Sequence, residues 1–122
     1  MPMRGLTVIV AGTDPDRLRS AIGLAAAQAA LGGKARLFLD GVSAGLLALP
    51  IAAASDRDHA AAGLPSLAQL VETALALDVA ILLCQSGLAL AGIAADGIDS
   101  RVGTGGITGI MATLGDDRLV AL

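Results

Sequence analysis

Residues 79–93 read VAILLCQSGLALAGI, and the fold prediction starts from the boundary inside this stretch. The apolar run from Val79 to Leu83 ends at Cys84, the only cysteine of the chain. A short apolar run with such a sharp end predicts a buried strand. Ligands and reactive groups gather beyond the carboxyl ends of the strands in a parallel α/β sheet. The stretch therefore predicts a thiol at a strand end.

The first third of the chain has the pattern of a β-α-β unit. The sequence LTVIV at residues 6–10 is typical of a strand buried on both faces of a sheet. A helix is predicted at about 16–31, with Thr13 and Asp16 at capping-box spacing before its apolar stripe. Residues 34–39 predict a second strand, parallel to the first because a crossover joins them.

The later segments continue the alternation of strands and helices. They predict a short helix at 42–49, a mobile surface loop at 52–63, a helix from Ser66 to about Asp78, a strand at 79–83, a short helix at 88–95, a brief strand within 97–102, a helix at 107–114 and a strand at 118–122. This order predicts one three-layer α/β/α domain over residues 1–122, with a mostly parallel, Rossmann-like sheet.

Composition limits the classes of function. Of the 122 residues, 55% are hydrophobic but only 1% aromatic and 16% charged, so the surface is expected to keep apolar patches that form subunit contacts. We therefore expect a homo-oligomer. The formal net charge is -3 without a cluster of Lys or Arg, which argues against a nucleic-acid partner.

The termini and the single cysteine bear on the cellular compartment. One cysteine forms no internal disulfide, and the amino-terminal apolar run is too short for a secretory signal, so a cytoplasmic protein is expected. Residues 79–95 are strongly apolar but contain Gln85, Ser86 and two glycines, and they end at Asp96. This window is shorter than the roughly 20 apolar residues of a membrane span.

Cys84 is the first candidate for chemistry. Only the ionised sulfur attacks or carries another sulfur atom, and backbone N–H groups at a helix start stabilise a thiolate. The residues expected to supply such stabilisation directly follow the cysteine; they are Gln85, Ser86 and Gly87. The alternative is that Cys84 is only a small buried hydrophobe.

A second group of candidates lies farther along the chain. Gly105 and Gly106, in the turn predicted at Gly-Thr-Gly-Gly before a helix, have the flexibility to surround an anion or to stabilise the thiolate; tight turn geometry is the alternative. Thr13 and Asp14 follow the first strand, and His59 is the only histidine, so all three are candidates for the same crevice. Helix capping and a solvated loop are their simpler explanations. We expect no metal and no cofactor, because the sequence has no metal-ligand cluster.

The motifs together resemble the DsrE/DsrF/DsrH-like family, the YchN-type small α/β proteins of sulfur metabolism, in its single-domain DsrE-like branch. The resemblance rests on AGTDPDRLRSAIGLAAAQAALGGKARLFLDG, on GLPSLAQLVETALALDVAILLCQ leading into Cys84, on LALAGI after it and on GGITGIM near the end. It implies a parallel five-stranded sheet, trimers or hexamers, and a cysteine that carries persulfide sulfur between proteins. The chain departs from the branch after Cys-Gln, where methionine, serine, methionine and an acid are usual and residues 86–89 are Ser-Gly-Leu-Ala.

Three hypotheses follow for the function. The first is a sulfur carrier of the sulfurtransferase type, in which Cys84 takes sulfane sulfur from a donor and passes it to an acceptor protein or small thiol. The second is an oligomeric binding module without catalysis that holds a small anion or nucleotide near Gly105 and Gly106. The third is a subunit whose main role is association, with Cys84 in packing.

Overall fold

The computed structural model describes residues 3–122. Its strands are β1 (Leu6–Val10), β2 (Ala35–Leu39), β3 (Ala80–Cys84), β4 (Gly103–Gly105) and β5 (Arg118–Ala121). Its α-helices are α1 (Pro15–Ala30), α2 (Asp56–Ala61), α3 (Leu67–Ala76), α4 (Gln85–Ala91) and α5 (Ile107–Ala112), and two 3₁₀ helices are η1 (Gly41–Leu47) and η2 (Ala95–Gly97). The predicted alternation of strands and helices is therefore confirmed.

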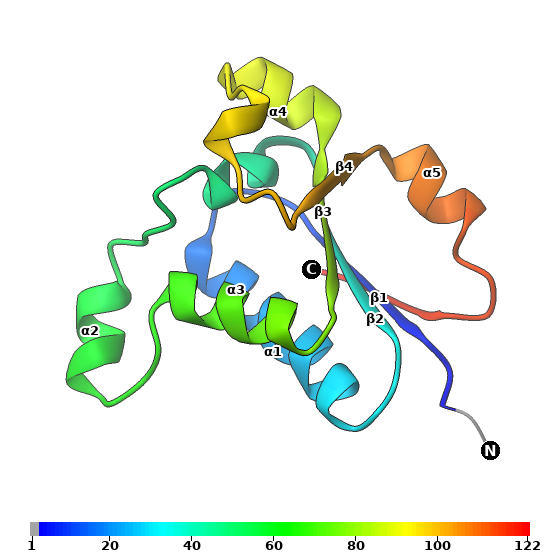
Figure 1. The fold of residues 1–122 in the computed structure, drawn as a ribbon, viewed down its shortest axis with the longest axis horizontal. Helices are drawn as coiled ribbons and strands as arrows, with labels where there is room; N and C mark the ends of the chain where they lie inside the picture. The colour runs from blue at the N-terminus through cyan, green and yellow to red at the C-terminus, as the bar shows by residue number, and fades with distance from the viewer. Residues whose placement is uncertain (1–2) are drawn as a thin grey trace.

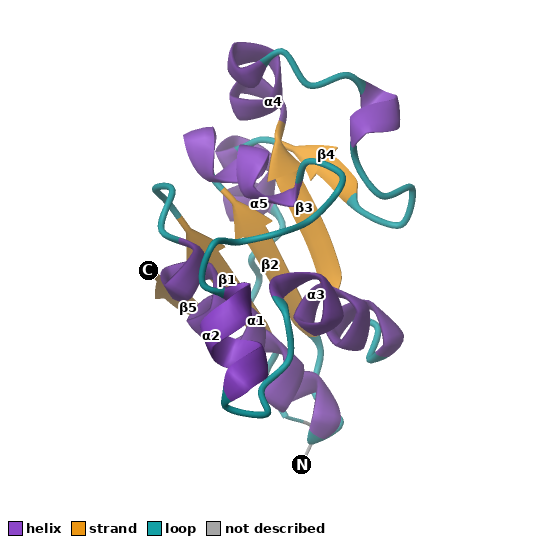
Figure 2. Cartoon of the chain, turned by 90° about the vertical axis from the view of Figure 1, so that its left-hand side faces the viewer, coloured by secondary structure: helices purple, strands orange, loops and turns teal. Residues whose placement is uncertain are grey.

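The five strands form one sheet in the order β4-β3-β2-β1-β5, and all neighbours are parallel. Every strand consequently ends at the same edge of the sheet. Figure 2 shows this common direction, with α4 beyond the carboxyl end of β3. The sheet is entirely parallel where the sequence predicted a mostly parallel one.

Helices cover both faces of the sheet. Figure 1 shows α1 and α3 on one side and α5 on the other. Val8, Leu37 and Ile81 are neighbours on adjacent strands and lie on the α1 side, where they are fully or almost fully buried. Thr7 and Arg36 point to the opposite face, because the Arg36 guanidinium donates to Thr113 and to the backbone of Ile110 in and beside α5.

The helix starts show how local chemistry sets the element boundaries. Ser66 caps α3 in a complete capping box with Gln69, as predicted from the sequence. The start of α1 differs from the prediction, since Asp14 is the N-cap and its carboxylate accepts from the backbone N–H of Asp16 at 2.9 Å. Pro15 takes the first helical position, where its missing N–H costs no hydrogen bond.

Three predicted segments are wrong in detail. The predicted loop at 52–63 contains α2, none of whose residues is buried. The helix predicted at 88–95 begins directly after Cys84. The strand predicted within 97–102 lies at Gly103–Gly105, where a tight turn was expected, because these residues pair with the end of β3.

Among residues 3–122, no helix is both long and apolar enough to cross a membrane.

Candidate functional site

Cys84 is the last residue of β3 and the N-cap of α4, with extended backbone angles of φ -63° and ψ 120°. It therefore lies at the edge of the sheet where all strands end, as the sequence predicted. Only 7% of its surface is exposed. Side chains alternate along a strand, so Cys84 shares the α5 side of the sheet with Leu82 and Ala80.

Gly87 allows α4 to pack closely against η1. A Cβ atom at Gly87 would overlap the backbone carbonyl oxygen of Gly41 and lie 2.6 Å from its carbonyl carbon. α4 packs against η1 at this contact, and both follow directly from neighbouring strands of the sheet. The sequence predicts that Gly87 helps to stabilise the thiolate; the structure shows its close packing against Gly41.

Gln85 and Ser86 form the exposed flank of the candidate site. Both side chains are exposed at the first turn of α4, next to the mostly buried Cys84. Among the described residues, no hydrogen bond links the Ser86 hydroxyl to the Cys84 sulfur. These two residues are therefore placed to contact a molecule that approaches the thiol.

Gly105 pairs with Cys84 across β3 and β4, so the glycine segment does lie beside the thiol. The segment Gly103–Gly105 is an edge strand and not a turn. Gly106 follows as the exposed N-cap of α5 with extended backbone, φ -134° and ψ 164°. The two glycines thus form one wall beside the cysteine without the loop geometry of an anion cradle.

The remaining candidates are not gathered at Cys84. Thr13 and Asp14 follow β1, which is separated from β3 by β2, and the Asp14 carboxylate is used to cap α1. His59 belongs to α2, and its Nδ1 lies 2.8 Å from the backbone oxygen of Ser55. Figures 1 and 2 both show α2 far from α4.

Asp40 is an acidic neighbour of the site that sequence reasoning missed. Leu39 of β2 pairs with Leu83 of β3, so the chain positions that follow, Asp40 and Cys84, come at the same end of two neighbouring strands. The sequence does contain a signal for this placement, because Asp40 and Cys84 each directly follow an apolar run. Strand order was needed to bring the two together.

The loop before β4 is held to α3 by charge. Arg101 donates to both carboxylate oxygens of Glu72, at 2.7 and 2.6 Å, and to Asp99 at 3.0 and 2.8 Å. Hydrogen bonds from the Arg101 side chain and backbone lower the pKa of Asp99 to about 2. The side-chain bond to Arg101 also lowers the pKa of Glu72, and both carboxylates raise the pKa of Arg101.

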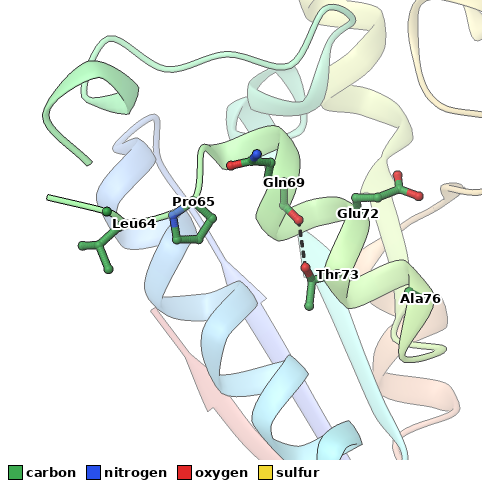
Figure 3. Close-up of a pocket in the computed structure, with 7 residues that line it drawn as sticks. Leu64, Pro65, Gln69, Glu72, Thr73 and Ala76 are labelled. Atoms are coloured by element: carbon green, nitrogen blue, oxygen red, sulfur yellow. Dashed lines mark hydrogen bonds between the residues drawn. The ribbon is translucent and has the colours of Figure 1, made fainter. Parts of the chain in front are cut away.

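Two hollows of the surface lie away from the thiol. One of about 600 Å³ follows the outer surface of α3, between Leu64, Pro65 and Thr73; Figure 3 shows Thr73 donating to the backbone oxygen of Gln69 there. The other, of about 500 Å³, lies at the amino ends of β2 and β3. Cys84 lines neither. Within residues 3–122, no group of three or more His, Cys, Asp or Glu side chains is arranged to hold a metal ion.

Comparison with known proteins bears on the fold. No family model matches the chain, and no curated protein sequence matches it. Among solved structures, the crystal structure of the ychN protein from E. coli matches with a TM-score of 0.79 and 18% sequence identity, covering 98% of this chain and 100% of that chain. The chain therefore has a YchN-type α/β fold, the DsrE-like fold that its sequence resemblance predicted.

Proposed function

We propose that this protein is a cytoplasmic sulfur carrier in which Cys84 holds sulfur as a persulfide. The observation that supports the proposal is the location of the only cysteine at the carboxyl end of β3, with a small exposed surface and no disulfide partner. In parallel α/β sheets, reactive groups gather at this edge. The cytoplasm keeps such thiols reduced, as sulfur transfer requires.

The chemistry is an exchange without net oxidation. The Cys84 thiolate attacks the outer sulfur of a donor persulfide, R–S–SH; a bond forms between Sγ and that sulfur, and the donor's S–S bond breaks. The donor leaves as the thiolate R–S⁻, and Cys84 becomes Cys–S–SH. An acceptor thiolate then attacks the outer sulfur, takes it as a new persulfide and regenerates the Cys84 thiolate.

Neighbouring residues have distinct roles in this proposal. Ser86 and Gln85, exposed on the first turn of α4, donate hydrogen bonds to the sulfur chain as it is transferred. Gly105 and Gly106 keep the β4 side of Cys84 free of side chains, so that a donor or acceptor can approach there. Asp40 supplies an acid beside the thiol, in place of the acid that the sequence lacks after Cys-Gln.

We also propose that the protein works as a homo-oligomer, a trimer or hexamer. On the α5 side of the sheet, a row of neighbouring residues runs Leu119-Thr7-Arg36-Ala80. α5 covers the middle of this row, but Leu119 and Ala80 at its ends are exposed, and so are Ile107 and Met111 on α5 itself. Exposed apolar side chains such as Leu119, Ile107 and Met111 are of the kind that a subunit contact buries. Light scattering coupled to size exclusion measures the assembly directly.

Intact mass spectrometry tests the sulfur-carrier proposal. After incubation with a sulfane-sulfur donor, the wild-type chain is expected to gain the mass of one sulfur atom, and an acceptor thiol is expected to remove it. The Cys84→Ser variant is expected to gain nothing. Ser86→Ala, which removes one neutral hydrogen bond, is expected to slow the transfer by about two- to tenfold. A wild-type chain that gains no sulfur contradicts the proposal and favours a role in binding or association.

A further inference from the structure

The crevice at the amino ends of β2 and β3 lies at the opposite edge of the sheet from Cys84. Its volume of about 500 Å³ is within the range of small-molecule sites, and the apolar residues Leu6, Ala35 and Ala80 are part of its lining. The remaining lining is charged or polar. These charges therefore determine which class of ligand fits the crevice.

One part of the lining is a fixed, internally neutralised pair. Arg36 donates through Nε to the Thr7 hydroxyl at 2.7 Å, through Nη1 to the Thr113 hydroxyl at 2.7 Å and through Nη2 to the Ile110 carbonyl at 2.8 Å. The Thr7 hydroxyl in turn donates to Asp117 at 2.8 Å, and Asp117 lies 3.9 Å from Arg36 Nε. This network forms one wall of the crevice. The positive charge of Arg36 and the negative charge of Asp117 balance each other there.

The other part consists of two charges without partners. Lys34 and Asp78 precede β2 and β3, and the pairing of Arg36 with Ala80 brings them to neighbouring positions at the same end of the sheet. Within the described chain, neither the Lys34 ammonium nor the Asp78 carboxylate has a hydrogen bond or ion pair. A purely anionic ligand would meet Asp78, and a purely cationic one would meet Lys34.

The backbone at Asp78 breaks two local preferences. Asp78 has a φ of 62°, in the left-handed region where glycine is preferred. It also puts a negative charge after the last turn of α3, where the helix dipole is already negative. Glycine would avoid both costs. Positions that break local rules are expected at functional sites, and a cation bound to Asp78 would offset the unfavourable charge.

We propose that this crevice binds a small zwitterion of the α-amino-acid class. The Asp78 carboxylate takes the ammonium group of the ligand, Lys34 takes its carboxylate, and an apolar side chain lies over the exposed Ala80. The proposal is independent of the chemistry at Cys84. Because Lys34 and Asp78 are exposed, the affinity is expected to be low, with a Kd of about 1 mM or weaker.

Three matched probes separate the two charges of the ligand. The uniformly ¹⁵N-labelled chain is titrated with leucine, with N-acetylleucine, which lacks the ammonium group, and with leucinamide, which lacks the carboxylate. Leucine is expected to shift the backbone amide signals of Ala35, Arg36 and Ala80 in a saturable way. Each of the other probes is expected to bind at least about tenfold more weakly. Equal binding of all three, or no saturable shift up to the solubility limit of leucine, overturns the proposal.

Variants assign the charges to residues. Asp78→Asn and Lys34→Gln are each expected to weaken leucine binding by about tenfold, while Asp58→Asn on the exposed surface of α2 leaves it unchanged. Asp78→Gly is expected to raise stability and to lose binding, which separates ligand recognition from folding. Cys84→Ser is expected to bind leucine like the wild type, so that a failure here differs from a failure of the sulfur-carrier proposal. Binding unchanged in both charge variants overturns the assignment.

Discussion

Gly87 of α4 and Gly41 of η1 are in direct backbone contact, so close that no Cβ atom fits at residue 87. The residues that follow β2 and β3 are thereby packed together at the edge of the sheet that carries Cys84. Gly87→Ala is expected to displace α4 and to destabilise the fold by about 1–3 kcal/mol, the usual cost of overpacking. Chemical denaturation measures this change, and thiol alkylation rates report the displacement at Cys84.

Gly109→Ala is the matched control for Gly87→Ala. Gly109 also lies within a helix, α5, and a Cβ there meets no atom within 4 Å. Since alanine is the better helix former, the control is expected to be neutral or to stabilise by up to about 1 kcal/mol. Equal destabilisation by both variants would show that close packing at Gly41 does not explain Gly87.

Asp78 ends α3 in a complete Schellman motif. The N–H of Val79 donates to the Ala74 carbonyl and that of Asp78 to the Leu75 carbonyl, both at 3.0 Å. Asp78→Gly is expected to raise the free energy of unfolding by about 0.5–1 kcal/mol, because relief of left-handed strain exceeds the entropy that glycine adds to the unfolded chain. Asp78→Ala removes the unfavourable charge but keeps the strain, so it is expected to stabilise less than Asp78→Gly. Thermal unfolding of both variants decides the point.

The Arg101 ion pairs predict a pH-dependent contribution to stability. In the folded chain, the pKa of Asp99 is lowered from its ordinary 3.8 to about 2, and that of Glu72 falls below its ordinary 4.5. A lowered folded-state pKa means that the contribution is complete above about pH 4.5 and is lost as the pH falls toward 2. The effect is expected to be small, since all three side chains are partly solvated.

Arg101→Ala tests this interpretation. Its Tm is expected to be lower than that of the wild type at pH 7, and the two Tm values are expected to converge as the pH approaches 2. Asp58→Asn, on α2 and away from the cluster, is the control variant. A Tm difference that stays constant from pH 7 to pH 2 would rule out these carboxylates as its source.

Thr7 connects the sheet to the segment that carries α5 and β5. Its hydroxyl is fully buried, accepts from Arg36 and donates to Asp117. Thr7→Val keeps the shape but leaves both charged partners short of a hydrogen bond, so a loss of about 1–3 kcal/mol is expected. Thr73→Val removes a hydroxyl from the exposed side of α3 and is expected to cost less than about 1 kcal/mol. Similar losses in urea denaturation for both variants would contradict the proposed importance of the buried network.

Local sequence was enough to predict most of the architecture. The apolar runs at 6–10, 34–39 and 79–83 predicted β1, β2 and β3, and capping residues around Ser66 predicted the start of α3. These patterns work because side-chain periodicity and helix caps depend on residues a few positions apart. Cys84 at a strand end followed from the same reasoning.

The helix α2 was not predicted from the local sequence pattern. Its residues have no apolar period, and none is buried. Asp56, at its start, accepts hydrogen bonds from the backbone of Ala53 and Leu67 and from the Arg19 side chain, and these bonds lower its pKa. Two of these partners are distant in sequence. A helix held by such contacts leaves no periodic signal.

The sequence by itself determined the parallel α/β class, the order of most elements and the strand end that carries Cys84. Tertiary structure alone decided which residues became neighbours: Asp40 beside Cys84, Gly41 against Gly87, and Lys34 near Asp78. The physical reason is that strand order and helix packing join segments far apart in the chain, and no local pattern of residues encodes which strand will lie next to which.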